Sequence, residues 1–279
     1  MKPRVNNERV IEIGITLRSI GIIGAKYFES LDPQMDIARE LVSKCSNNAL
    51  YLLALNSLVS YSLTMRGEIF WKEFSKYVLL RCREIESFHD IVKIVKEFTM
   101  IYNRYLLNQK IRRLDRIMHC KDIVNYINNV KLVELRNYIA KCLDSDPDSK
   151  TIVFSIKMIY YGLRALGYDY TLPFDIPIPV DRRVARISST SGVIECESLK
   201  PCNIEYVLHY PKIIIKAWNE IGKTSSIPPL HIDAIIWYFG GFSNATNRNE
   251  ILNAIDRRLI DYFGIEKIRE LINNLFYQL

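Results

Sequence analysis

The sequence predicts an all-α protein. Apolar residues recur at helical spacing along most of its 279 residues, strand-like alternation is scarce, and no glycine-rich phosphate-binding pattern occurs. The expected helices, in chain order, span residues 35–46, 49–64, 68–82, 88–108, 131–143, 150–166, 181–193, 204–221, 229–241, 248–260 and 263–277.

Two breaks organise this succession of helices. Residues 172–180 read LPFDIPIPV, and three prolines in nine residues exclude a helix and favour an extended path. Residues 144–149 (DSDPDS) form a short turn between the helices expected at 131–143 and 150–166. A helix–turn–helix unit is therefore followed by an extended segment and by a helix that begins at Asp181.

The composition narrows the class of protein. A hydrophobic fraction of 49% supports a large core, and a net charge of +7 suits a polyanionic partner such as nucleic acid. No apolar run approaches the roughly 20 residues of a membrane span, and the N-terminus lacks the apolar core of a signal peptide. We therefore expect an intracellular protein that does not bind a membrane.

The cysteines and histidines predict no metal centre. No two cysteines form a CxxC pair, so we expect buried, reduced thiols and no iron–sulfur cluster. The four histidines lack the spacing of zinc ligands. The six cysteines are Cys45, Cys82, Cys120, Cys142, Cys196 and Cys202.

One helix carries an unusual stripe of lysine and aromatic residues. Residues 150–164 are apolar on nearly all faces, as in a helix surrounded by others. Lys150, Phe154, Lys157 and Tyr161 nevertheless share one face, at i, i+4, i+7 and i+11. Lys150 starts this helix, where the dipole and partial burial favour a neutral, nucleophilic amine. The alternative is that Lys150 is a solvated first residue and Lys157 extends its ammonium group to water.

An aspartate stands where the proline-rich segment meets the next helix. Asp181 suits an N-cap, which is a common structural role. Arg182, Arg183 and Arg186 follow it, and a helix N-terminus offers N–H groups to anions. The junction therefore fits either a simple cap or a carboxylate presented beside a phosphate-binding helix end.

These strings together resemble a known family. VDRRVAR (180–186) resembles the aspartate signature of the helix-hairpin-helix DNA glycosylases, and the wider match is similar to the archaeal GO glycosylases (AGOG), which excise 8-oxoguanine. The resemblance ends near residue 240. The segments that carry it are LDPQ (31–34), ALNSLVSYSLTMRGEIFW (54–71), KTIVFSIK (150–157), LPFDIPIPVDRRVAR (172–186) and IPPLHIDAIIW (227–237).

The resemblance implies an architecture. It implies one glycosylase unit over residues 1–279, with the helix-hairpin-helix DNA glycosylase fold and two helical subdomains flanking an active-site cleft. The hairpin unit then covers about 131–166, and the proline-rich segment with the helix of the catalytic aspartate covers 172–193. The family's usual glycine-rich hairpin is replaced by the acidic turn at 144–149, and the four-cysteine cluster of some relatives is missing.

The resemblance also implies a bifunctional N-glycosylase and DNA lyase. Lys150 matches the nucleophile that attacks the anomeric carbon, and Asp181 matches the carboxylate that stabilises positive charge on the sugar. The resulting imine permits strand cleavage by β-elimination. No metal or cofactor is implied. We expect a monomer that binds DNA containing 8-oxoguanine in the cytoplasm of an archaeon, in association with the nucleoid.

The damaged base is expected to leave the helix and enter a pocket. Phe154 and Trp237 are the expected stacking surfaces, and Lys157 is expected to oppose Asp233. Taken singly, Trp71 and Trp237 fit core positions and Gln34 fits a turn. The residues that match the family's pocket are Gln34, Ser60, Trp71, Phe154, Lys157, Pro179, Asp233 and Trp237.

Basic side chains are expected to contact the DNA backbone. Arg182, Arg183 and Arg186 are candidates beside the aspartate. The segment QKIRRLDR (109–116) is another candidate, or else a solvated helix face; its basic residues are Lys110, Arg112, Arg113 and Arg116.

Three other functions stay open. The protein could be a related glycosylase for another damaged base, with a different pocket but the same chemistry. It could be a non-catalytic helical DNA-binding module, although that predicts loss of Lys150 or Asp181, and both are present. An unrelated all-α scaffold would require the five ordered matches to be coincidence.

Overall fold

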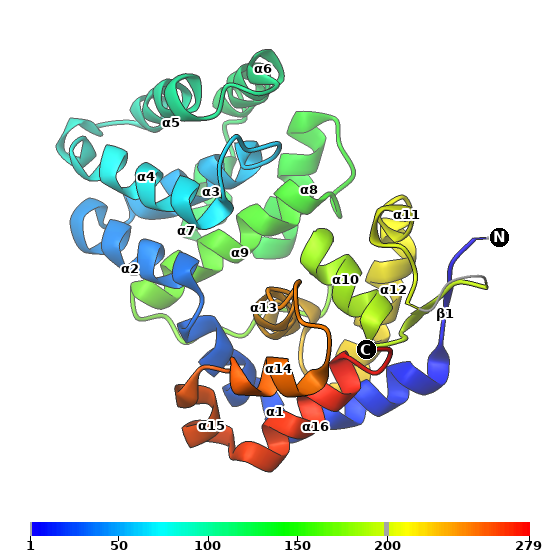
Figure 1. Ribbon diagram of the computed structural model, residues 1–279. Coiled ribbons are helices and arrows are strands. Elements are labelled where there is room, and N and C mark those ends of the chain that lie inside the picture. Colours follow the sequence, from blue (N-terminus) through cyan, green and yellow to red (C-terminus); the bar gives the residue numbers. More distant parts are fainter. Residues whose placement is uncertain (1, 198–200) are drawn as a thin grey trace. The chain divides into compact units, whose positions relative to one another are not determined.

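Helices dominate the computed structural model, which describes residues 2–197 and 201–279. The all-α fold class is therefore confirmed (Figure 1). Two strands of two residues each, β1 (Arg4–Val5) and β2 (Ile194–Glu195), pair antiparallel. The helices are α1 (Asn7–Ser30), α2 (Pro33–Cys45), α3 (Asn48–Val59), α4 (Gly67–Leu79), the 3-10 helix η1 (Cys82–Glu84), α5 (Phe88–Tyr102), α6 (Leu107–Met118), α7 (Ile123–Asn128), α8 (Leu132–Leu143), α9 (Lys150–Ala165), α10 (Arg182–Thr190), α11 (Ile204–Leu208), α12 (Pro211–Ser225), α13 (Pro229–Phe239), α14 (Arg248–Asn253), α15 (Arg257–Phe263) and α16 (Ile265–Leu275).

The chain divides into two compact units. One unit is contiguous and spans Ser30–Leu172; we call it the lysine unit because it contains Lys150. The other joins two separate stretches, the residues up to Glu29 and Pro173–Leu279; we call it the aspartate unit because it contains Asp181. Among the described residues, no helix is both long and apolar enough to cross a membrane.

The lysine unit is built around α9. Every residue of α9 from Thr151 to Leu163 is buried except Phe154, because α2, α3 and α8 pack against it. Helix α3 is equally enclosed, with all of Ala49–Val59 buried. Helix α8, a turn and α9 form the helix–turn–helix unit, so the sequence located both helices of this unit to within one residue at each end.

The C-terminal forty residues, which carry no recognised motif, hold the aspartate unit together. At the end of α10, the Thr190 hydroxyl donates to the Leu275 carbonyl (2.9 Å), and the Gln278 N–H donates to the Thr190 carbonyl (2.8 Å). The guanidinium group of Arg9, near the start of α1, donates to the carbonyls of Ser191 and Asn274. Both stretches of the unit therefore meet at the C-terminal end of α10.

Several helices differ from the sequence expectation for identifiable reasons. The helix expected at 204–221 is two helices, because Pro211 lacks an N–H group and starts a new helix. The helix expected at 248–260 is also two, because the Asp256 carboxylate accepts from the Arg258 N–H and caps a second start. Helices α1, α6 and α7 are not among those expected from the sequence.

The expectation of free thiols is wrong. All six cysteines are paired: Cys45 with Cys82, Cys120 with Cys142, and Cys196 with Cys202. Their Cα atoms lie 5.1, 6.3 and 5.5 Å apart, within the range of disulfides. The sequence spacing of the cysteines does not indicate this pairing. Two of the pairs are 37 and 22 positions apart in the sequence and come together only because helices pack against one another. Disulfides occur in intracellular proteins of hyperthermophiles, so cysteine pairing does not by itself indicate secretion.

Candidate active site

Lys150 is the first residue of α9 and its side chain is exposed, unlike almost all of the helix that follows. Ser149 precedes it in an extended conformation, with no side-chain hydrogen bond that caps the helix. The amine therefore extends from the positive end of the helix dipole, at the end of the acidic turn. A buried helix fixes the backbone of Lys150 while its amine stays within reach of solvent, which suits a nucleophile.

Lys157, two turns further along α9, is buried in an ion pair. Its ammonium nitrogen lies 3.2 Å from Asp32 Oδ2, and the Tyr161 hydroxyl donates to the same oxygen at 2.9 Å. The Lys157 and Asp32 side chains are each 2% exposed. The alternative that Lys157 extends its charge into water is therefore wrong, because a carboxylate of the same unit takes that role. The expected opposition of Lys157 and Asp233 stays a prediction.

Asp32 also holds the backbone of a predicted pocket residue. Asp32 is the N-cap of α2, and its Oδ1 accepts from the Gln34 N–H at 2.9 Å. One carboxylate thus binds Gln34 through one oxygen and Lys157 through the other. Asp32 is not among the residues predicted for the site, although the LDPQ string has a recognisable signal, an aspartate directly before a proline at a helix start.

Two predicted pocket aromatics contact each other. The rings of Trp71 on α4 and Phe154 on α9 lie 5.9 Å apart between centroids at an interplanar angle of 80°. Trp71 is buried, whereas Phe154 is the partly exposed residue of an otherwise buried stretch. Trp71 therefore serves as a core residue that holds Phe154 in place, and Phe154 retains an exposed face for stacking.

Ser60, another predicted pocket residue, directly follows α3, and its hydroxyl donates to the Asn56 carbonyl at 2.7 Å. Asn56 is fully buried, and neither polar atom of its side chain has a hydrogen-bond partner among the described residues. Such an amide is costly to leave unpaired. The sequence gives no sign of this, because an asparagine in an apolar helix does not show whether its amide is satisfied.

Asp181 caps α10. Its Oδ1 accepts from the N–H groups of Arg183 and Val184 at 2.9 and 3.0 Å. The buried Pro179 precedes it in the extended segment that ends at the cap. The capping role expected of Asp181 is thereby confirmed, and the same contacts fix the direction of its carboxylate.

Asp233 and Trp237 lie one turn apart on α13, where Asp233 is buried and Trp237 is partly exposed. The helix is anchored by His231, whose Nδ1 lies 2.6 Å from Glu29 Oε1 in a fully buried contact. The carboxylate and the indole therefore share one face of a helix that is fixed at its start.

The arginines after Asp181 have different surroundings. The Arg183 guanidinium group stacks 3.8 Å from the centroid of the Trp237 ring, and Arg186 donates to the Gly240 carbonyl. Arg182 is exposed and pairs with the exposed Glu205 at 2.5 Å. Arg183 and Arg186 thus join α10 to α13. Backbone contacts by all three stay a prediction.

The basic segment 109–116 forms most of α6, and its basic side chains differ in burial. Lys110 is fully buried and donates to Asn103, so it faces the core and not DNA. Burial lowers the pKa of Lys110 to about 8. Arg112, Arg113 and Arg116 line a pocket, and Arg113 shares the Tyr61 ring with Lys110.

The predicted site residues fall into two groups by unit. Within the lysine unit, the structure joins Gln34 to Lys157 through Asp32, and Trp71 to Phe154. Within the aspartate unit, it joins Arg183 of the Asp181 helix to Trp237 on α13. The members of the first group are Gln34, Ser60, Trp71, Lys150, Phe154 and Lys157, and those of the second are Pro179, Asp181, Asp233 and Trp237.

The chain combines an all-α fold with a lysine that opens the second helix of a helix–turn–helix unit and an aspartate that caps a later helix, as expected from the resemblance to the DNA glycosylases. Its class is that of an N-glycosylase/DNA lyase. A family model described as AGOG: N-glycosylase/DNA lyase matches residues 14–273. The chain belongs to this AGOG family, and it is an enzyme of DNA repair with N-glycosylase and lyase function.

Individual relatives agree with the family. The chain is 35% identical to an N-glycosylase/DNA lyase of Nanoarchaeum equitans, over 79% of this chain and 86% of the relative. It is 36% identical to one of Methanopyrus kandleri, over 80% and 84%. It is also similar to a crystal structure of Pa-AGOG, the 8-oxoguanine DNA glycosylase of Pyrobaculum aerophilum, in complex with 8-oxoguanosine. That match has a TM-score of 0.70 and 26% identity, and it covers 93% of this chain and 97% of the other.

Proposed function

We propose that this N-glycosylase/DNA lyase excises 8-oxoguanine, with Lys150 as nucleophile and Asp181 as its carboxylate partner. The observation that carries the proposal is the position of Lys150, an exposed amine on the first residue of a buried helix. The name and the bound 8-oxoguanosine of the similar Pa-AGOG structure support the choice of base.

The proposed reaction begins with attack on the sugar. The neutral Lys150 amine forms a bond to C1′, and the glycosidic bond breaks so that its electron pair leaves with the base. Asp181 stabilises the positive charge that develops on the sugar, and it accepts a proton from the lysine nitrogen. The capping N–H groups hold this carboxylate in one direction, which reduces reorganisation during the reaction.

The lyase step follows from the covalent intermediate. Opening of the sugar ring gives an imine between Lys150 and C1′, which acidifies C2′. Loss of a C2′ proton then expels the 3′ phosphate by β-elimination, and water later hydrolyses the imine. These steps use side chains and water only, so we propose no metal, organic cofactor or iron–sulfur cluster.

Recognition of the base requires a distinction from guanine. 8-Oxoguanine carries an N–H group on its imidazole side that guanine lacks. A buried acceptor that binds this N–H group has no partner when guanine enters the pocket, so guanine binds less favourably. We propose Gln34, Ser60 and Asp233 as the hydrogen-bonding residues. We propose Phe154 and Trp237, both partly exposed, as the stacking residues, with Trp71, Lys157 and Pro179 completing the pocket.

The remaining parts of the proposal concern partners and location. We propose that the protein acts as a monomer on DNA in the cytoplasm of an archaeal cell, next to the nucleoid. The net charge of +7 supports association with a polyanion. Arg182, Arg183 and Arg186 are the proposed backbone contacts beside Asp181.

Borohydride trapping tests the nucleophile and the substrate together. Wild-type protein is incubated with an oligonucleotide that carries one 8-oxoguanine, and borohydride reduces the imine to a stable bond. We expect a covalent complex for the wild type and for Lys141→Ala, an exposed lysine of α8, but none for Lys150→Ala. Lys157→Ala is included after its folding has been checked by circular dichroism.

Two results would contradict this proposal. A complex that disappears in a folded Lys157→Ala but persists in Lys150→Ala would move the nucleophile two turns along α9. If the wild type forms no complex with 8-oxoguanine but does so with another lesion, the protein is a glycosylase for a different damaged base.

A further inference from the structure

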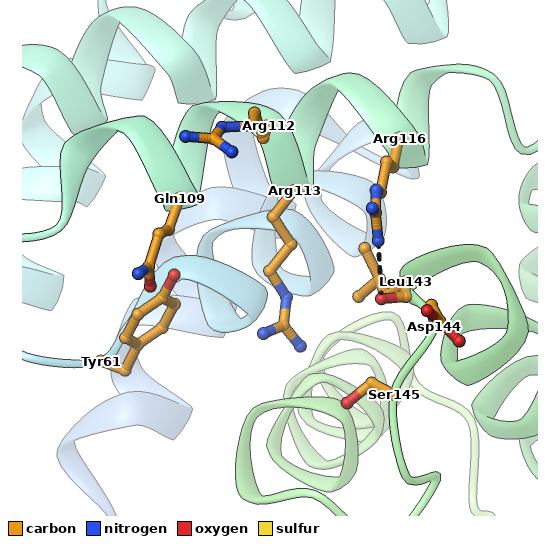
Figure 2. A pocket seen from close by; sticks show the side chains of 8 residues that line it. All are labelled: Tyr61, Gln109, Arg112, Arg113, Arg116, Leu143, Asp144 and Ser145. Atoms are coloured by element: carbon orange, nitrogen blue, oxygen red, sulfur yellow. Dashed lines mark hydrogen bonds between the residues drawn. The ribbon is translucent and has the colours of Figure 1, made fainter.

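The concave surface beside the helix–turn–helix unit is strongly basic. A pocket of about 290 Å³ lies between α6 and the end of α8. Figure 2 shows that its walls come from separate parts of the lysine unit: Tyr61 just after α3, helix α6, Leu143 at the end of α8 and the start of the acidic turn. The lining residues are Tyr61, Gln109, Arg112, Arg113, Arg116, Leu143, Asp144 and Ser145.

Arg113 connects this pocket to the nucleophile's helix. Its side chain extends from α6 between Tyr61 and the turn, as Figure 2 shows, and its Nη2 donates to the Thr151 hydroxyl at 2.8 Å. Thr151 directly follows Lys150 in the first turn of α9. One arginine of the pocket therefore contacts the residue next to the proposed nucleophile, and both belong to the lysine unit.

The guanidinium groups of this pocket form no ion pair within the part of the chain that the structure describes. The Arg113 Nε is buried and has no hydrogen-bond partner among the described residues. Arg112 forms no hydrogen bond or ion pair with any described residue, and Arg116 donates to the Leu143 carbonyl at 3.1 Å. Three guanidinium groups thus face one carboxylate of the pocket lining, that of Asp144, which is exposed.

Two carboxylates of the neighbouring acidic turn have partners that do not line the pocket. Asp148 pairs with the mostly buried Arg136 at 3.3 Å, and Asp146 accepts from the Asp148 N–H at 2.9 Å. The charges of Asp146 and Asp148 are therefore not balanced by the arginines of α6. The pocket lined by these arginines keeps a net positive charge.

We propose that this pocket binds a backbone phosphate of the DNA strand that carries the lesion. The proposal rests on the proposed function. Guanidinium groups bind phosphate oxygens bidentately, and the Tyr61 hydroxyl, the Gln109 amide and the Ser145 hydroxyl supply further donors. The bound phosphate fixes the strand relative to the first turn of α9 and so positions the sugar for attack by Lys150.

Salt-dependent DNA binding tests the pocket. Arg112→Gln and Arg113→Gln are compared with wild type and with Arg83→Gln, an exposed arginine of η1 that does not line the pocket. We expect each pocket variant to bind an undamaged duplex about tenfold more weakly. The slope of log affinity against log salt should fall by about 0.9 for each phosphate that the variant no longer neutralises. Thermal unfolding shows which variants are folded; the exposed Arg112 keeps the test valid if Arg113→Gln is unstable.

Uncharged phosphate analogues locate the bound phosphate. A methylphosphonate is placed at successive positions of the strand, and at one position near the lesion it should weaken wild-type binding but have no further effect in Arg112→Gln. The proposal is overturned if the effects of analogue and substitution add at every position. It is also overturned if Arg83→Gln loses as much affinity as the pocket variants. Base excision by the wild type is measured in parallel, so a wrong substrate is distinguished from a wrong phosphate site.

Discussion

A single carboxylate, that of Asp32, binds the Lys157 ammonium, the Tyr161 hydroxyl and the Gln34 backbone. A buried ion pair does not add much net stability, but removal of one partner leaves an uncompensated charge. Asp32 therefore has two separable roles, the cap of α2 and the counter-charge of Lys157.

Asp32→Asn separates these two roles. Asparagine caps a helix as well as aspartate does, so the cap remains while the charge is lost. We expect the free energy of unfolding to fall by about 3 kcal/mol or more, measured by urea denaturation. Asp36→Asn is the control on the same helix, because its pair with Arg39 is exposed and should contribute less than about 1 kcal/mol. Equal effects for the two variants would show that Lys157 does not depend on Asp32.

Lys110 gives a second prediction at the scale of one residue. Its pKa is about 8 in the folded protein and 10.5 ordinarily, so the folded protein carries the full cost of the buried ammonium below pH 8. Between pH 8 and 10.5 the unfolded chain binds a proton that the folded protein has lost, and stability rises with pH. Measured against Lys110→Met, the wild type should gain at most about 3 kcal/mol across this window.

The comparison with Lys110→Met cancels the titration of other groups, since both proteins share them. A difference that stays constant over the window would mean that Lys110 remains charged throughout. The oxygens of Asn103 would then stabilise the ammonium enough to offset its burial.

At the scale of helices, α10 and α13 approach closely at one glycine. A Cβ atom on Gly240 would lie 2.6 Å from the Arg183 Cβ and 2.9 Å from the Ile236 carbonyl. Both distances are shorter than packed atoms allow, and neither is to the end of a flexible side chain. Gly240 therefore sets the distance between the helix capped by Asp181 and the helix that holds Asp233.

Gly240→Ala should consequently separate these helices. We expect lower thermal stability, by about 1–3 kcal/mol at the melting temperature, and a lower rate of base excision in single-turnover measurements. Gly67→Ala at the start of α4 is the control, because its Cβ would meet no atom within 4 Å. Excision by Gly240→Ala at the wild-type rate would show that the spacing of α10 and α13 is not critical.

The helix boundaries show how much of the structure the sequence could predict. Helix α9 is predicted almost to the residue, because its apolar run begins after a turn of aspartates and one proline. The helix start at Asp181 is predictable because three prolines exclude a helix before it. The helix break at Pro211 was indicated by the proline itself, but apolar residues continue at helical spacing on both sides of it. By contrast, the disulfides and the interactions of Asp32 depend on which helices pack together, and one sequence does not contain that information.

For the molecule as a whole, the disulfides predict a graded loss of stability. Loop-closure entropy gives about 3–4 kcal/mol for the bridges that close 37 and 22 residues, and about 2 kcal/mol for the one that closes 6. We therefore expect Cys120→Ser/Cys142→Ser to lower the free energy of unfolding more than Cys196→Ser/Cys202→Ser. The measurement is denaturant unfolding without reductant; the reverse order would show that chain entropy does not dominate.

The split construction of the aspartate unit has a consequence during synthesis. The lysine unit is contiguous, so its residues have all left the ribosome while Pro173–Leu279 is still being made. Residues up to Glu29 must wait for the last helices, to which Arg9 and Thr190 are bonded. A chain that has not yet been translated through α16 can therefore hold Lys150 in a complete unit, while the unit that contains Asp181 still lacks the segments that Arg9 and Thr190 contact.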